Sequence, residues 1–239
     1  MEKAAELGHN VTGTQMSPDD TKALLEAVEK YPPDIKGNAS KLAAAREAMR
    51  READPIGTVP IPGSVKGLLK SGFDKMLGKQ PELLVDKLGE RLAYERTGVR
   101  LYEAVLAKFE GTETGDKELI PTLQRIRDDE VAHMLLVKQA IETLGADPTA
   151  MTPCADVVGV MSMGIMQVLS DPRTNVAQAL NALLTLELTD HAGWELLVEL
   201  TNKAGHPNIA EGFEKALAEE ERHLSVIKSL LKQQLEAQA

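Results

Sequence analysis

The 239-residue chain is poor in several residue types, and each shortage excludes a class of protein. Aromatic residues make up only 3% of the chain, and the single cysteine, Cys154, excludes an intramolecular disulfide. Basic residues are outnumbered by acidic ones, and the net charge of −10 argues against binding to nucleic acid. The N-terminus has no signal-peptide core, and no apolar run approaches the roughly 18 residues of a membrane span. We therefore expect a cytoplasmic protein that does not enter a membrane.

The residues that are abundant favour helices. Ala, Leu, Glu and Lys dominate, whereas the alternation of β-branched residues that is typical of strands is hard to find. Hydrophobic residues make up 43% of the chain and charged residues 27%, the balance of a soluble globular protein. The fold class predicted from composition and periodicity is all-α.

Residues 1–80 are expected to form an N-terminal extension. Short helical patterns over residues 17–31, 38–53 and 64–78 are separated by prolines and glycines, and residues 54–63 have the composition of a linker. None of these segments could bury a core alone. We expect the extension to cover the main domain or the surface of a partner.

Residues 81–239 carry four long amphipathic patterns of roughly 28 residues, about 40 Å each at the rise of an α-helix. The predicted helices span residues 81–109, 117–144, 174–203 and 209 to the C-terminus. Short turns join the first two and the last two, whereas the connection over residues 154–171 is long, apolar and itself helical in pattern. This order predicts a four-helix bundle domain with a helical crossover between its second and third helices.

Two of the four helices place polar residues within the stripe of apolar side chains that should face the core. Glu130 and His133 lie in the stripe of the second helix, and Glu220 and His223 lie in that of the fourth. A single Glu-x-x-His is a weak signal that composition alone can produce. Two copies, both on core-facing stripes, are harder to attribute to chance.

The first and third helices each carry one glutamate in the same kind of position, Glu95 and Glu187. Residues 94–103 align with residues 186–195, which also matches Tyr102 with Trp194. The spacing from the lone glutamate to the glutamate of Glu-x-x-His is 35 residues in the first half and 33 in the second. The pattern therefore predicts a bundle of two similar halves.

Buried carboxylates need a nearby positive charge, because an isolated ionised carboxylate in an apolar core is very unfavourable. Two divalent metal ions would supply four charges for the four carboxylates. Arginine and lysine are scarce on the inward stripes, so a core of salt bridges is the less favoured explanation. Carboxylate and imidazole ligands favour iron or manganese, and the cysteine is not in the set.

On these residues, the region 81–239 resembles the ferritin-like superfamily of di-iron carboxylate proteins. The resemblance implies two metal ions per chain, iron first and manganese or a mixed iron–manganese pair otherwise. It implies that Glu130 and Glu220 bridge the ions, that Glu95 and Glu187 are terminal ligands, and that His133 and His223 each bind one ion. In such domains the first ligand is followed seven residues later by a tyrosine; Tyr102 matches it and is the candidate catalytic residue.

Other polar residues near these positions leave alternatives open. His191 follows Glu187 by four residues and is either a seventh metal ligand or an imidazole outside the ligand set. Asp190 competes for the role of holding a ligand histidine. Glu219 is expected to be solvated. Asp129 is expected either to face solvent or to hold a histidine of the other half.

Three hypotheses for function share the predicted site. The first is an oxidoreductase that reacts with O₂ or peroxide at a di-iron or iron–manganese centre. The second is an iron-binding or storage protein with ferroxidase activity, and the third is a helical interaction protein with a vestigial metal site. The fold does not choose among them.

The expected partners follow from the first hypothesis. They are O₂ or peroxide, a protein that donates electrons, and a second copy of the chain in a homodimer. One cysteine cannot form the Cys₄ iron site of a self-contained rubrerythrin, so the electrons would come from elsewhere.

Overall fold

The computed structural model describes residues 17–32, 34, 37–53, 59, 81–110 and 118–239. Every regular element in these ranges is a helix, which confirms the predicted all-α class. The chain divides into two compact units, Met1–Asp54 and Pro55–Ala239.

The first unit contains two of the predicted short helices, α1 (Pro18–Lys30) and α2 (Ala39–Glu52). Pro18 occupies the first turn of α1, where its missing N–H group costs nothing, and the side chain of Asn38 accepts a hydrogen bond from the backbone N–H of Lys41 at the start of α2. Neither helix contains a buried residue. The predicted helix over 64–78 and the domain boundary at residue 80 lie outside the described residues, and so does the predicted linker except for Val59.

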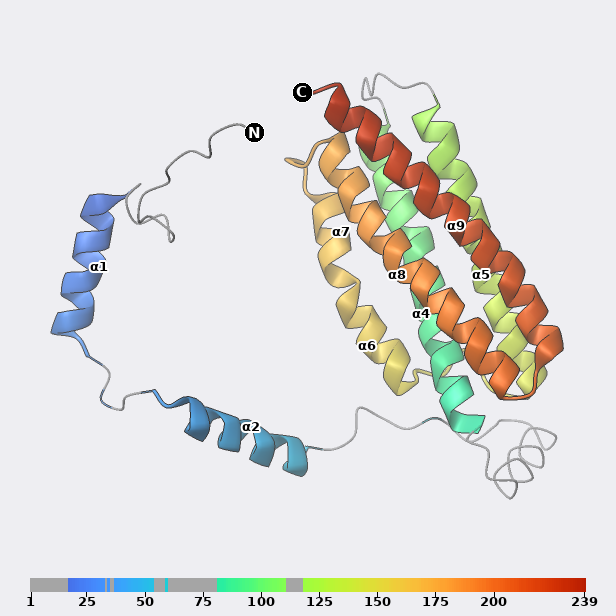
Figure 1. Cartoon of the computed structure of the whole chain (residues 1–239), viewed down its shortest axis with the longest axis horizontal. Helices are drawn as coiled ribbons and strands as arrows, with labels where there is room; N and C mark the ends of the chain where they lie inside the picture. Colours follow the sequence, from blue (N-terminus) through green and yellow to red (C-terminus); the bar gives the residue numbers. More distant parts are fainter. Residues whose placement is uncertain (1–16, 33, 35–36, 54–58, 60–80, 111–117) are drawn as a thin grey trace, which may run out of the picture. The chain divides into compact units, whose positions relative to one another are not determined.

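The second unit contains the predicted bundle (Figure 1). Its long helices are α4 (Pro81–Phe109), α5 (Leu119–Leu144), α8 (Val176–Lys203) and α9 (Pro207–Glu236). The helices α4 and α5 pack as one pair and α8 and α9 as the other. The crossover consists of α6 (Pro153–Met161) and α7 (Met163–Ser170), which run along α4 (Figure 1). The helical crossover is thus confirmed.

The core of the bundle is divided into two apolar clusters. One contains Leu101, Leu119 and Leu180, and the other contains Leu88 and Phe213. Along α5, α8 and α9, the residues of one cluster are separated from those of the other by the positions of the predicted site. The polar residues therefore lie in a layer with packed apolar side chains on both sides, where bulk water does not reach them.

The crossover requires one correction to the sequence analysis. Residues Pro153–Ser170 have a mean hydropathy of 1.3 and are long and apolar enough, by length and composition alone, to cross a membrane. Only 22% of this stretch is buried in the structure. Ala155, Val158 and Leu169 face the bundle, whereas Val160 and Met161 are exposed. Packing against α4 thus explains only part of the apolar character.

Candidate metal centre

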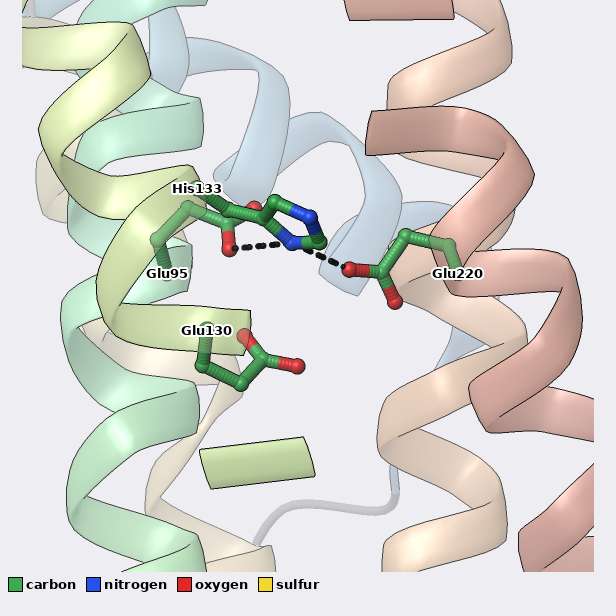
Figure 2. Close-up of side chains that lie close together, drawn as sticks. All are labelled: Glu95, Glu130, His133 and Glu220. Atoms are coloured by element: carbon green, nitrogen blue, oxygen red, sulfur yellow. Dashed lines mark ion pairs between the residues drawn. The ribbon is translucent and has the colours of Figure 1, made fainter. Parts of the chain in front are cut away.

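Each of the four long helices contributes to the polar layer. Glu95 comes from α4, Glu187 from α8, and one Glu-x-x-His motif from each of α5 and α9. Figure 2 shows how the side chains from α4 and α5 meet that of Glu220 from α9. All six predicted ligands are buried, with at most 4% of any of them exposed: Glu95, Glu130, His133, Glu187, Glu220 and His223.

The donor atoms of these six residues form two groups, each compact enough for one metal ion. One group consists of Glu95, Glu130, His133 and Glu220, and the other of Glu130, Glu187, Glu220 and His223. Within each group, the donor atoms lie within 4.8 Å of one another. Glu130 and Glu220 belong to both groups, so each of these two residues could serve both ions.

Both histidines direct the same ring nitrogen into the site. Nδ1 of His133 lies 2.7 Å from Oε1 of Glu220 and 3.9 Å from Oε2 of Glu95. Nδ1 of His223 lies 3.3 Å from Oε2 of Glu220 and 4.0 Å from Oε2 of Glu187. Nδ1 is therefore the nitrogen that each imidazole would offer to a metal ion.

The outward nitrogens of these histidines contact acids of the opposite half. Nε2 of His133 lies 2.9 Å from Glu219, and Nε2 of His223 lies 3.1 Å from Asp129. Such contacts orient a ligand imidazole and make it a stronger donor. The structure therefore chooses the second alternative for Asp129. The expectation that Glu219 is simply solvated was wrong. Asp129 and Glu219 each directly precede the glutamate of a Glu-x-x-His motif, and this shared position could have predicted that both have the same role.

Tyr102 and His191 lie outside both groups of donor atoms. The buried hydroxyl of Tyr102 donates a short hydrogen bond to Oε1 of Glu187. His191 is half-buried. Its neighbour Asp190 is fully buried, but it forms an ion pair with Arg91 and not with a ligand histidine.

Arg91 is the residue of this region that the sequence analysis missed. Its guanidinium is buried, with Nε 2.9 Å from Oε1 of Glu95 and Nη1 2.8 Å from Oδ1 of Asp190. The signal was present, because Arg91 precedes Glu95 by four residues and so shares its face of the helix. Arg91 and Asp190 balance each other's charge. Four carboxylates remain for the ions.

Proton affinities in the site reflect its crowding with buried acids. Burial raises the pKa of Glu130 well above its ordinary value, with Asp190 and Glu95 adding to the effect, and raises the pKa of Glu187 to about 8. Burial acts to lower the pKa of His133, but its contacts with Glu220 and Glu95 raise it to about 9. Without metal ions, the site at neutral pH therefore holds protons in their place.

The residues fit a pair of divalent cations. Both carboxylate oxygens of Glu130 and Oε2 of Glu187 are buried and accept no hydrogen bond from the described part of the chain. Buried oxygens of this kind are unfavourable unless a cation or a proton satisfies them. The six residues would provide oxygen and nitrogen ligands for two cations, and the cations would balance the charge of the carboxylates.

The raised pKa values predict how the stability of the metal-free protein depends on pH. Between pH 4.5 and about 8, Glu187 is protonated in the folded state but ionised in the unfolded chain. Between pH 6.5 and about 9, His133 is likewise protonated only when folded. In both cases the unfolded state binds fewer protons, so stability falls as the pH rises. Urea unfolding with a chelator at pH 5, 7 and 9 measures this loss.

The control for this measurement is the double variant Glu187→Gln/His133→Gln, which removes two of the groups that gain a proton on folding and should make the pH dependence shallower. Added metal should also reverse the loss in the wild-type protein, because metal binding requires the deprotonated ligands. A metal-free wild-type protein whose stability is constant or rises from pH 5 to 9 contradicts the prediction.

Gly98 provides a second test, because it leaves room for the shared carboxylate. A Cβ atom at this position would lie 2.6 Å from Oε2 of Glu130. Gly98→Ala should displace that carboxylate and weaken metal binding by about tenfold or more. The metal-free fold should remain stable, because alanine is the better helix former. A calorimetric metal titration measures the affinity, and urea unfolding with a chelator measures the stability of the metal-free fold.

The matched control is Gly159→Ala in α6, where an added Cβ would meet no atom of the described part of the chain within 4 Å. It should leave the affinity for metal unchanged. Equal affinities in the Gly98→Ala and Gly159→Ala proteins would show that the close approach at Gly98 has no part in forming the site.

Comparisons with known proteins support the fold. No family model and no curated protein matches the chain. Among solved structures, the chain is similar to one described as a crystal structure of ferritin like, diiron-carboxylate proteins from Bacillus anthracis str. Ames, with a TM-score of 0.50 and 22% sequence identity. The match covers 62% of this chain and 94% of that chain. The bundle therefore has the ferritin-like fold, with a buried cluster of carboxylates and histidines that fits two metal ions.

Proposed function

We propose that the protein is an oxidoreductase that reacts with O₂ or peroxide at a dinuclear non-haem iron centre, or at a mixed iron–manganese centre. One observation carries the proposal: two groups of buried donor atoms share the carboxylates of Glu130 and Glu220. These residues would hold two metal ions close together, and redox-active ions there would supply the electron transfer that O₂ or peroxide chemistry requires. The ferritin-like fold is compatible with this chemistry but does not select it.

Iron is favoured by the chemistry of the donors. All are carboxylate oxygens or imidazole nitrogens, which suit iron and manganese, and Cys154 is not among them. When bound, iron supplies the changes of oxidation state that O₂ or peroxide chemistry requires. The similar solved structure from Bacillus anthracis is described as one of diiron-carboxylate proteins, which agrees with this choice.

The side chains around the ligands have separable roles. The apolar clusters on both sides of the layer exclude water from it, and Asp129 and Glu219 orient the two imidazoles. Tyr102 holds a proton at Oε1 of Glu187. It is therefore the proposed catalytic residue, since its hydroxyl is buried and touches a ligand.

Electrons would come from a separate protein. The chain has a single cysteine and cannot form a Cys₄ iron site of its own. The alternative of iron storage uses the same ligands, but the crossover helices cover α4 and change the outer surface on which a storage shell would be built.

Metal content and reactivity test the proposal together. Protein loaded anaerobically with Fe(II) should hold two ions per chain, one for each group of donor atoms. It should consume O₂ or peroxide with a change in visible absorption. Glu130→Ala should lose metal and reactivity, whereas Glu195→Ala, an exposed residue of α8, should lose neither.

Other outcomes separate the alternatives. A very large, iron-filled particle on gel filtration would support storage and overturn the oxidoreductase proposal. Metal content well below one ion per chain, unchanged by Glu130→Ala, would leave only the interaction protein with a vestigial site.

We also propose that a second copy of the chain covers the exposed face of the crossover, giving a homodimer. Val157, Val160, Met161 and Met163 are exposed there. Between Asp156 and Asp171 the chain has no charged residue. Two copies that each carry a net charge of −10 repel one another, and an uncharged apolar face is where they can approach at least cost.

Light scattering coupled to gel filtration tests the dimer. The wild-type protein should have twice the mass of one chain, and Val160→Lys should dissociate it, because the dimer would bury an unpaired charge. Thr185→Lys places the same charge on an exposed position of α8 and should leave the dimer intact. A monomeric wild-type protein overturns the proposal.

A further inference from the structure

The two halves of the bundle provide the same set of predicted ligands, but their terminal glutamates, Glu95 and Glu187, contact different side chains. Oε1 of Glu95 lies 2.9 Å from Nε of Arg91, a cation. The corresponding oxygen of Glu187 accepts a hydrogen bond from Tyr102, a neutral phenol. The residue four before Glu187, in the position equivalent to Arg91, is the buried Leu183. Among the residues that the structure describes, an arginine therefore lies against the terminal glutamate at only one of the two predicted metal positions.

The guanidinium of Arg91 is held in this place by α8. Its Nη1 contacts Oδ1 of Asp190 at 2.8 Å and the backbone oxygen of Asp190 at 3.0 Å. Gly193 leaves the space, since a Cβ there would lie 2.6 Å from Nη1. The ring of Tyr94 lies 4.5 Å from the guanidinium carbon. Arg91 is 5% exposed and cannot turn its charge to solvent.

A fixed cation at one oxygen of a carboxylate changes what the other oxygen can offer. It withdraws electron density from the carboxylate and repels a metal ion at the free oxygen. Asp190 neutralises the net charge but contacts a different nitrogen, Nη1, while Nε of Arg91 lies 2.9 Å from Oε1 of Glu95. The hydrogen bond from Tyr102 orients Glu187 without bringing a charge. Partners of this kind change metal affinity by about 10–100-fold.

We propose that Arg91 is a positioning residue that makes the two metal positions unequal, so that the position of Glu187 and His223 fills first and the position of Glu95 and His133 binds its ion more weakly. The inference rests on the proposed dinuclear centre. Within that centre it assigns the weaker ion to the side that Arg91 faces.

The first experiment titrates the metal-free full chain with Mn(II) and follows it by calorimetry and electron paramagnetic resonance. One equivalent should give the spectrum of an isolated ion. A second equivalent, bound about tenfold or more weakly, should convert this spectrum to that of a coupled pair. His223→Ala should lose the tighter step, and His133→Ala should keep it.

The second experiment removes the cation. The double variant Arg91→Met/Asp190→Asn eliminates both members of the Arg91–Asp190 ion pair, so neither of these two charges is left buried without the other. The two dissociation constants of the double variant for Mn(II) should then lie within about threefold of each other. Because the second ion would no longer bind much more weakly than the first, the spectrum of the coupled pair should appear from the first additions. Arg91→Lys keeps the charge and should keep the inequality. Arg100→Met removes an exposed arginine of the same helix and should behave as wild type.

The outcomes distinguish the inference from the function on which it rests. A wild-type chain that binds no Mn(II), Fe(II) or Co(II) overturns both. A wild-type chain that binds two ions in equal steps overturns only the inequality. Unequal steps that persist in the double variant, or a tighter step lost in His133→Ala instead of His223→Ala, overturn the role of Arg91. If the double variant does not fold, the histidine variants still decide which position is weaker.

Discussion

Four glutamates at the centre of the bundle place negative charge where water cannot solvate it. Glu95, Glu130, Glu187 and Glu220 are fully buried between two apolar clusters. Such a layer is stable only if cations or protons occupy it. Without metal ions, bound protons reduce the negative charge, as the raised pKa values of Glu187 and His133 indicate. Two divalent ions would balance the charge and would also coordinate the buried oxygens that accept no hydrogen bond from the described residues.

The internal repeat explains how so costly a layer is built. Each half contributes one glutamate from its first helix and one Glu-x-x-His from its second, and each half's outer acid holds the histidine of the other. The halves are therefore interdependent, because each group of donor atoms contains residues of both halves. Residues that differ between the halves, such as Tyr102 and the matching Trp194, can therefore make the two predicted metal positions differ in their affinity for metal.

Much of this arrangement could be predicted from the sequence, because it depends on periodicity. A glutamate and a histidine three residues apart lie on one face of a helix wherever that helix packs, and their place within an apolar stripe directs them inward. The four long helices and the helical crossover follow from the same kind of pattern. Periodicity does not identify partners on other helices. The contact of Glu219 with His133 was missed for that reason.

The class of fold, the six inward candidate ligands and their concentration of negative charge all follow from spacing along single helices, so the sequence was enough to predict them. Only the tertiary structure decided that Arg91 stays inside. A long arginine side chain can extend to solvent from the edge of a stripe or fold inward, and the choice depends on what the facing helix offers. Here α8 offers a carboxylate at Asp190 and space at Gly193. Both lie about a hundred residues along the chain from Arg91, so only the packing of α4 against α8 could bring them to it.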